Sequence, residues 1–111
     1  MPRGELDALW ALMKRADGNV RLPRIIRYID ERFARAPRWI PPLSRLTDVP
    51  VLVMWGRRDP VAVFAIAERL AREIPRASMV ALDSLGHCPQ LEDPGRVAEV
   101  LGNFLADVSP V

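Results

Sequence analysis

Two apolar runs constrain the fold of this chain more than any other feature. VPVLVMWG at residues 49–56 is rich in β-branched side chains and stops at Gly56, which is typical of a strand buried on both faces. SMVAL at 78–82 is a second, shorter run. Between them, residues 60–75 carry apolar side chains at helical spacing. Strand, helix and strand in this order predict a βαβ unit with two parallel strands.

Amphipathic helical patterns lie on both sides of this unit. The segment ELDALWALMKR at 5–15 is followed by the turn sequence ADGN, and RLPRIIRYIDERFAR at 21–35 places apolar residues on one face and arginines on the other. Near the end of the chain, Asp93 and Pro94 are residue types preferred at the N-cap and first turn of a helix. The predicted apolar face of this closing helix consists of Val97, Val100, Leu101, Phe104, Leu105 and Val108. The whole pattern predicts an α/β fold.

A proline-rich bend divides the chain. Pro37, Pro41 and Pro42 are predicted to end the helical region. We therefore expect a helical segment over residues 1–42 and an α/β segment over residues 43–111. Half of the 111 residues are apolar, which is enough for a small folded domain with a modest core.

Composition excludes several classes of site. The single cysteine, Cys88, cannot form an internal disulfide, and with a single histidine, His87, no structural zinc site of the usual ligands can be assembled. We expect no metal and no cofactor. No apolar stretch approaches the roughly 18 residues of a membrane helix, and the chain starts without a signal-peptide pattern. The sequence therefore predicts a soluble, cytoplasmic protein with no membrane partner.

The arginines of the first half raise the question of nucleic-acid binding. Residues 1–58 contain twelve Lys or Arg and six Asp or Glu, whereas residues 59–111 contain four and eight. Asp30 and Glu31 interrupt the arginines, and no aromatic platform or base-reading motif accompanies them. We interpret them as a solvated helix face and expect no nucleic-acid partner. The arginines concerned are Arg21, Arg24, Arg27, Arg32, Arg35 and Arg38.

His87 and one acidic residue, Asp59, are the candidate catalytic residues. Asp59 follows the first predicted strand in GRRDP, and His87 follows the second in GHCPQLEDP. The carboxyl ends of parallel strands share one edge of a sheet, and neighbouring strands lie about 4.8 Å apart. We therefore expect the carboxylate and the imidazole to meet at this edge. There a carboxylate can fix the tautomer of a histidine and stabilise its protonated form during acid–base catalysis.

Residues near this pair are assigned structural roles. Asp93 and Glu92 are interpreted as helix-capping residues. Cys88 is interpreted as a small packing residue, because neighbours on an extended loop point in opposite directions. For Asp59 the structural alternative is a turn or cap residue before Pro60.

The motifs GRRDP at 56–60 and GHCPQLEDP at 86–94, in this order, resemble the C-terminal third of the α/β-hydrolase fold. Within that superfamily the chain resembles hydrolases related to mesoderm-specific transcript protein and, more distantly, haloalkane dehalogenases and epoxide hydrolases. The resemblance implies that Asp59 and His87 are the acid and the histidine of a catalytic triad. It also implies that residues 1–42 derive from the helical cap that covers the active site.

The chain lacks the nucleophile that this resemblance requires. An α/β-hydrolase places its nucleophile on a G-x-S-x-G elbow, or an Asp in the equivalent place, ahead of the acid and the histidine. No two of the six glycines here are four residues apart, and Ser44 lies outside any predicted strand-to-helix turn. We therefore expect the chain to be the acid-and-histidine fragment of a hydrolase, inactive alone. The complete protein would hydrolyse an ester, epoxide or carbon–halogen bond.

Two other classes of function fit parts of the sequence. A sheet of two parallel strands leaves the apolar edge of the first strand open. A non-catalytic binding or assembly module could self-associate through this edge. In a split hydrolase, an N-terminal complementing chain would cover it instead. A basic nucleic-acid binder is the weakest alternative. The substrate, the choice of Ser or Asp as nucleophile and the oligomeric state are not determined by the sequence.

Overall fold

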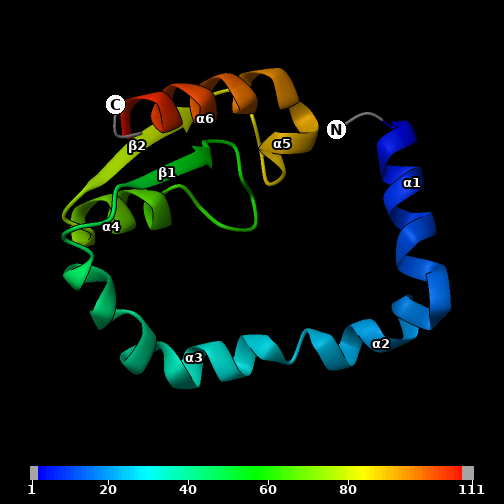
Figure 1. The fold of residues 1–111 in the computed structure, drawn as a ribbon. Helices are drawn as coiled ribbons and strands as arrows, with labels where there is room; N and C mark the ends of the chain where they lie inside the picture. Colours follow the sequence, from blue (N-terminus) through cyan, green and yellow to red (C-terminus); the bar gives the residue numbers. More distant parts are fainter. Residues whose placement is uncertain (1–2, 109–111) are drawn as a thin grey trace. The chain divides into compact units, whose positions relative to one another are not determined.

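A computed structural model describes residues 3–108 (Figure 1). The chain divides into two compact units, Met1–Pro41 and Pro42–Val111. Helices make up the described part of the first unit, whereas the second contains a parallel two-stranded sheet. The α/β class predicted from the sequence is confirmed. None of the helices within residues 3–108 combines the length and the apolar character needed to cross a membrane.

The described part of the N-terminal unit is a series of helices separated by backbone breaks. Its elements are α1 (Arg3–Lys14), η1 (Arg15–Asp17), α2 (Gly18–Ile25) and α3 (Tyr28–Trp39), and η2 (Pro41–Arg45) leads into the second unit. The predicted turn at ADGN is present. Ala16 and Asp17 adopt positive φ angles of 51° and 58°, which break the helical path between α1 and α2.

Two details of the sequence prediction for this unit are wrong. The helix predicted over 21–35 is interrupted after Ile25, where the backbone tightens to an i+3 hydrogen bond, the amide of Ile29 donating to the carbonyl of Ile26 at 3.0 Å. Pro37 does not end the helical region, because α3 continues to Trp39. A proline lacks a donor and its ring crowds the preceding turn, but the residues after it keep their donors, and the amide of Ile40 donates to the carbonyl of Ala36 at 3.0 Å.

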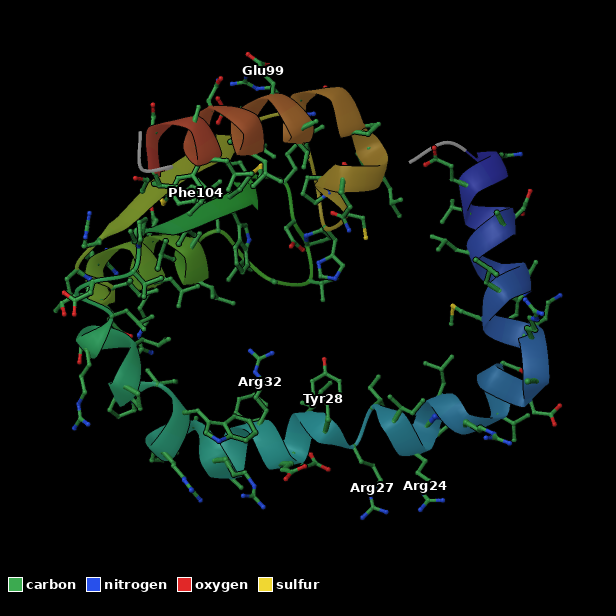
Figure 2. All side chains as sticks on the ribbon, in the orientation of Figure 1. Arg24, Arg27, Tyr28, Arg32, Glu99 and Phe104 are labelled. Atoms are coloured by element: carbon green, nitrogen blue, oxygen red, sulfur yellow. The ribbon has the colours of Figure 1, made fainter. Side chains whose placement is uncertain are left out.

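The arginines of this unit do not share one face. Arg24 and Arg27 point to one side of the helices, whereas Arg32 points to the other side (Figure 2). Arg35 is engaged in an ion pair with Glu31 at 2.9 Å. The predicted single arginine face is therefore wrong, because positions five apart, such as Arg27 and Arg32, already lie on different sides of a helix with 3.6 residues per turn.

The C-terminal unit is built on the predicted βαβ arrangement. Its elements after η2 are β1 (Val51–Gly56), α4 (Ala65–Glu73), β2 (Ala77–Leu82), α5 (Pro89–Glu92) and α6 (Pro94–Val108). The two strands are parallel, with Val51 opposite Ala77 and Gly56 opposite Leu82. Helices α4 and α6 lie on opposite faces of this sheet (Figure 1). Because the strands are parallel, the loops that follow them leave the sheet at the same, carboxyl end.

The core is small and lies on both faces of the sheet. On α6, Phe104 points toward the strands, whereas Glu99 points outward (Figure 2). Leu82, Leu85 and Val100 form a buried cluster between β2 and α6. The other buried apolar side chains are Val53, Ala67 and Ile74.

The sheet is less buried than the sequence predicted. In β1 only Val53 and Gly56 are buried, and Val49 lies outside the strand and is 55% exposed. Within residues 3–108, β1 pairs with no strand other than β2, so its second edge is open. Leu101 and Leu105 of α6 are exposed as well. Among the described residues, the predicted apolar face of α6 is therefore only partly covered.

Candidate active site

The loops that follow β1 and β2 meet backbone to backbone at the carboxyl edge of the sheet. The amide of Arg58 donates to the carbonyl of Leu85 at 2.9 Å. At Gly56 a Cβ atom would approach the Leu85 carbonyl oxygen to 2.7 Å and the Gly86 carbonyl oxygen more closely still. Glycine at residue 56 therefore permits the contact between the two loops.

The loop after β1 holds the side chain of Asp59 in a fixed, buried position. Its Oδ1 accepts hydrogen bonds from the amides of Val61 and Ala62 at 2.8 and 2.9 Å. The carbonyl of Ala62 in turn accepts a hydrogen bond from Trp55 Nε1 at 2.8 Å, which ties the loop to the strand. Because the chain makes this turn first, α4 begins at Ala65, later than the sequence predicted.

The structure brings the two predicted site residues together. His87 Nδ1 lies 3.0 Å from Asp59 Oδ1 and 2.9 Å from Asp59 Oδ2. The Asp59 side chain is 5% exposed, whereas that of His87 is 51% exposed. A neutral histidine that donates from Nδ1 carries its lone pair on Nε2. The arrangement therefore allows Nε2 of His87 to accept a proton while Asp59 holds the other side of the ring. The catalytic role of the pair stays a prediction.

Asp59 is held in its ionised form. Burial acts to raise the pKa of its carboxyl, but the hydrogen bond from His87 and those from the amides of Ala62 and Val61 outweigh burial. The pKa of Asp59 consequently lies below its ordinary value. Asp59 thus contacts His87, as predicted, and also accepts the turn hydrogen bonds that were its structural alternative.

A pocket of about 260 Å³ opens beside the pair. Four segments line it: the end of β1, the loop that carries Asp59, the loop that carries His87, and the start of α5. The lining residues are Met54, Trp55, Gly56, Asp59, Ala62, Gly86, His87, Pro89 and Gln90. The pocket places a space for a small molecule next to the imidazole.

Glu92 has a role that the sequence prediction missed. It was expected to cap a helix, but its carboxylate accepts hydrogen bonds from the amides of Gly86 at 2.7 Å and Cys88 at 3.2 Å. These two bonds lower the pKa of Glu92, against the raising effect of burial. Pro89, a residue type favoured in the first turn of a helix, was the available signal that the chain turns back here. The predicted cap role of Asp93 is confirmed, because its Oδ1 accepts from the Arg96 amide at 2.9 Å.

Other candidate groups lie outside this arrangement. Ser44 is in η2, away from any strand-to-helix turn. Cys88 is a partly buried free thiol in the loop that carries His87. Among residues 3–108, no group of three or more His, Cys, Asp or Glu side chains is placed to hold a metal ion.

Comparison with known proteins identifies relatives of this chain. Residues 2–100 match the family described as "Alpha/beta hydrolase family". LipZ from Mycobacterium tuberculosis is 39% identical over 104 residues, which cover 93% of this chain and 35% of LipZ. The human mesoderm-specific transcript homolog protein is 34% identical over 92 residues, which cover 81% of this chain and 27% of that protein.

A solved structure gives the same result. The structure of a thermophilic esterase from Thermogutta terrifontis matches with a TM-score of 0.58 and 32% sequence identity, covering 61% of this chain and 25% of the esterase chain. The resemblance predicted from the motifs is confirmed. The chain spans about a third, or less, of the length of the curated relatives named here.

Proposed function

Because the chain belongs to the α/β-hydrolase family, we propose that it supplies the acid, Asp59, and the base, His87, of a hydrolytic triad. One observation carries this proposal: His87 Nδ1 faces both carboxylate oxygens of Asp59 at the mouth of a pocket. The nucleophile belongs to a segment outside these 111 residues, because their sequence contains no elbow motif.

The proposed chemistry follows from the two ends of the imidazole. Nε2 of His87 accepts the proton of the attacking hydroxyl group or water, and Asp59 stabilises the imidazolium that results. The same proton then passes from Nε2 to the leaving group. Asp59 stays ionised throughout, which agrees with its lowered pKa.

Ester hydrolysis is the reaction we favour for the complete enzyme. It is supported by the likeness to a protein named as an esterase, at 32% identity over the region that covers 61% of this chain. This reaction uses a serine nucleophile. Epoxide or carbon–halogen hydrolysis through an aspartate nucleophile is the alternative, and a covalent alkyl-enzyme intermediate would distinguish it.

The N-terminal residues 1–42 are proposed to derive from the helical cap of such an enzyme. This is supported by the helical structure of their described part and by large apolar side chains that face solvent, such as Trp10 at 51% and Phe33 at 74% exposure. Exposed apolar surface of this kind is typical of a segment that packs against another part of a protein.

A second candidate is a non-catalytic module that self-associates through β1. The specific observation is the open edge of β1 within the described residues, together with exposed Val49. Sedimentation at several protein concentrations tests this candidate. A mass that rises with concentration, with no gain of activity when a nucleophile segment is joined, would favour the module over the hydrolase fragment.

The hydrolase proposal is tested by joining the chain to a segment that carries an oxyanion loop and a G-x-S-x-G elbow. The 111-residue chain alone should not hydrolyse a chromogenic ester above the buffer rate, because it has a base and no nucleophile. The joined protein should hydrolyse it, and the same protein with the elbow serine changed to alanine should not. Turnover by the isolated chain that disappears in His87→Ala would show that the nucleophile is within the chain, contrary to the proposal.

A further inference from the structure

The loop that carries His87 is held on both sides of the histidine by one side chain. Glu92 Oε2 accepts the amide hydrogen of Gly86 at 2.7 Å, and Glu92 Oε1 accepts that of Cys88 at 3.2 Å. These are the residues immediately before and after His87. We propose that Glu92 is a positioning residue whose carboxylate fixes the backbone around His87 and thereby sets the imidazole against Asp59.

Further backbone hydrogen bonds hold the loop and the Glu92 carboxylate in place. The carbonyl of Cys88 accepts hydrogen bonds from the amides of Leu91 and Glu92 at 2.9 and 3.0 Å, while its own amide donates to the Glu92 carboxylate. Both polar groups of Cys88 are therefore held by the single turn α5. Because Glu92 is the last residue of that turn, its side chain reaches back over the loop it must hold.

The two hydrogen bonds favour a glutamate at residue 92 and a small residue at residue 86. Two amide donors need two acceptors, and a glutamine would offer one oxygen and would turn an NH₂ group toward the second amide. Hydrogen bonds to an ionised acceptor are also stronger than those to a neutral one. At Gly86 a Cβ atom would stand 3.2 Å from Glu92 Oε1, so a larger residue would press against the carboxylate.

Glu92 acts through His87 and not on a substrate. It is absent from the residues that line the pocket beside His87. This inference rests on the proposed function for the role of His87 as the base. The placement of the ring can, however, be measured without any activity.

The tautomer of His87 is the readout. His87 is the only histidine, so ¹⁵N-labelled histidine gives one assignable pair of ring nitrogens. In the full wild-type chain the neutral ring should carry its proton mainly on Nδ1, facing Asp59. In Glu92→Gln the backbone around His87 loosens, and the ratio of Nδ1–H to Nε2–H should fall by about fivefold, which corresponds to the net contribution of one hydrogen bond.

A matched control is Glu99→Gln, which makes the same change on α6, where Glu99 points outward and pairs with Arg96 at 2.7 Å (Figure 2). It should keep the wild-type tautomer ratio. Glu92→Asp keeps the charge but is one methylene shorter, and it should lower the ratio as Glu92→Gln does. Backbone spectra of the strands verify that each variant is folded. A folded Glu92→Gln chain with the wild-type ratio would overturn the inference.

The wild-type chain also supplies a test that does not depend on the folding of a variant. A scalar coupling across the hydrogen bond from the Gly86 amide nitrogen to the Glu92 carboxyl carbon is expected, and its absence would overturn the inference. Failure of the proposed function gives a different result. A wild-type ring protonated mainly on Nε2 would remove the Asp59–His87 pair itself, whereas an Nδ1–H preference that survives Glu92→Gln excludes only the role of Glu92.

Discussion

Gly56 and Gly86 approach so closely that residue 56 has no room for a side chain, because a Cβ atom there would collide with the Gly86 carbonyl oxygen. This contact joins the loop that carries Asp59 to the loop that carries His87. The distance between the Asp59 carboxylate and the His87 imidazole is thus set by backbone packing at the ends of two adjacent strands. The geometry of the pair therefore depends on a residue that has no side chain of its own.

Gly56→Ala should therefore destabilise the chain. The added methyl group meets backbone atoms, which cannot rotate away, and overpacking of this kind costs about 1–3 kcal/mol. The control is Gly102→Ala in α6, where a Cβ atom would meet nothing within 4 Å. That change should stabilise the helix by up to about 1 kcal/mol. Urea denaturation measures both, and a Gly56→Ala chain as stable as wild type would contradict the close approach.

Asp93→Ala should destabilise the start of α6. The Asp93 carboxylate accepts the Arg96 amide hydrogen at 2.9 Å, and loss of such a cap costs about 1 kcal/mol. Asp93→Asn, which can accept the same bond, should recover most of the loss. The free energy of unfolding from urea titrations is the measurement. Equal stability of the alanine and asparagine variants would show that the cap contributes nothing.

The sequence predicted the βαβ unit well because its signals are strong and local. The apolar run that contains Val53 is interrupted by a glycine and followed by a helical pattern, which leaves few alternative arrangements. The order of the elements then placed Asp59 and His87 at one edge, since parallel strands share their carboxyl ends. Predicting the pair required only strand order and the roughly 4.8 Å spacing of strands.

Other features could not be read from local patterns. The four residues of α5 are too few for a periodic signal, so the return of Glu92 to the His87 loop was missed. The burial of β1 was overestimated. Its apolar run indicates that the strand can be covered on both faces and edges, but within residues 3–108 it pairs with β2 alone. The break after Ile25 is a change from i+4 to i+3 hydrogen bonding, which leaves the apolar spacing almost unchanged.

Low pH should lower the free energy of unfolding, because Asp59 and Glu92 then become protonated. The pKa of each carboxyl in the folded chain lies below its ordinary value, 3.8 for Asp59 and 4.5 for Glu92. The unfolded chain therefore binds more protons over this range, and stability rises with pH. The contribution is fully present above the ordinary values and is lost as the pH falls through the lower folded-state values.

The measurement is the urea midpoint followed from about pH 6 to pH 3, where acid unfolding of paired carboxylates takes place. The midpoint of wild type should fall with decreasing pH. In Glu92→Gln the fall should be smaller, because one of the two carboxyls with a lowered pKa is gone. A variant whose midpoint falls as steeply as that of wild type would show that Glu92 does not contribute.

We propose that Asp59 orients and stabilises His87 as the base of a hydrolase. This role is tested by the value of kcat/KM for an ester in the joined protein that carries the nucleophile elbow, compared between wild type and Asp59→Asn. Asparagine fits the space of Asp59 but carries no charge and favours the wrong tautomer of His87. We predict a loss of about three to four orders of magnitude with the fold retained, and a loss of activity to the buffer rate in His87→Ala. A value for Asp59→Asn within about twofold of wild type would contradict this role of Asp59, because the acid would then have to come from another loop.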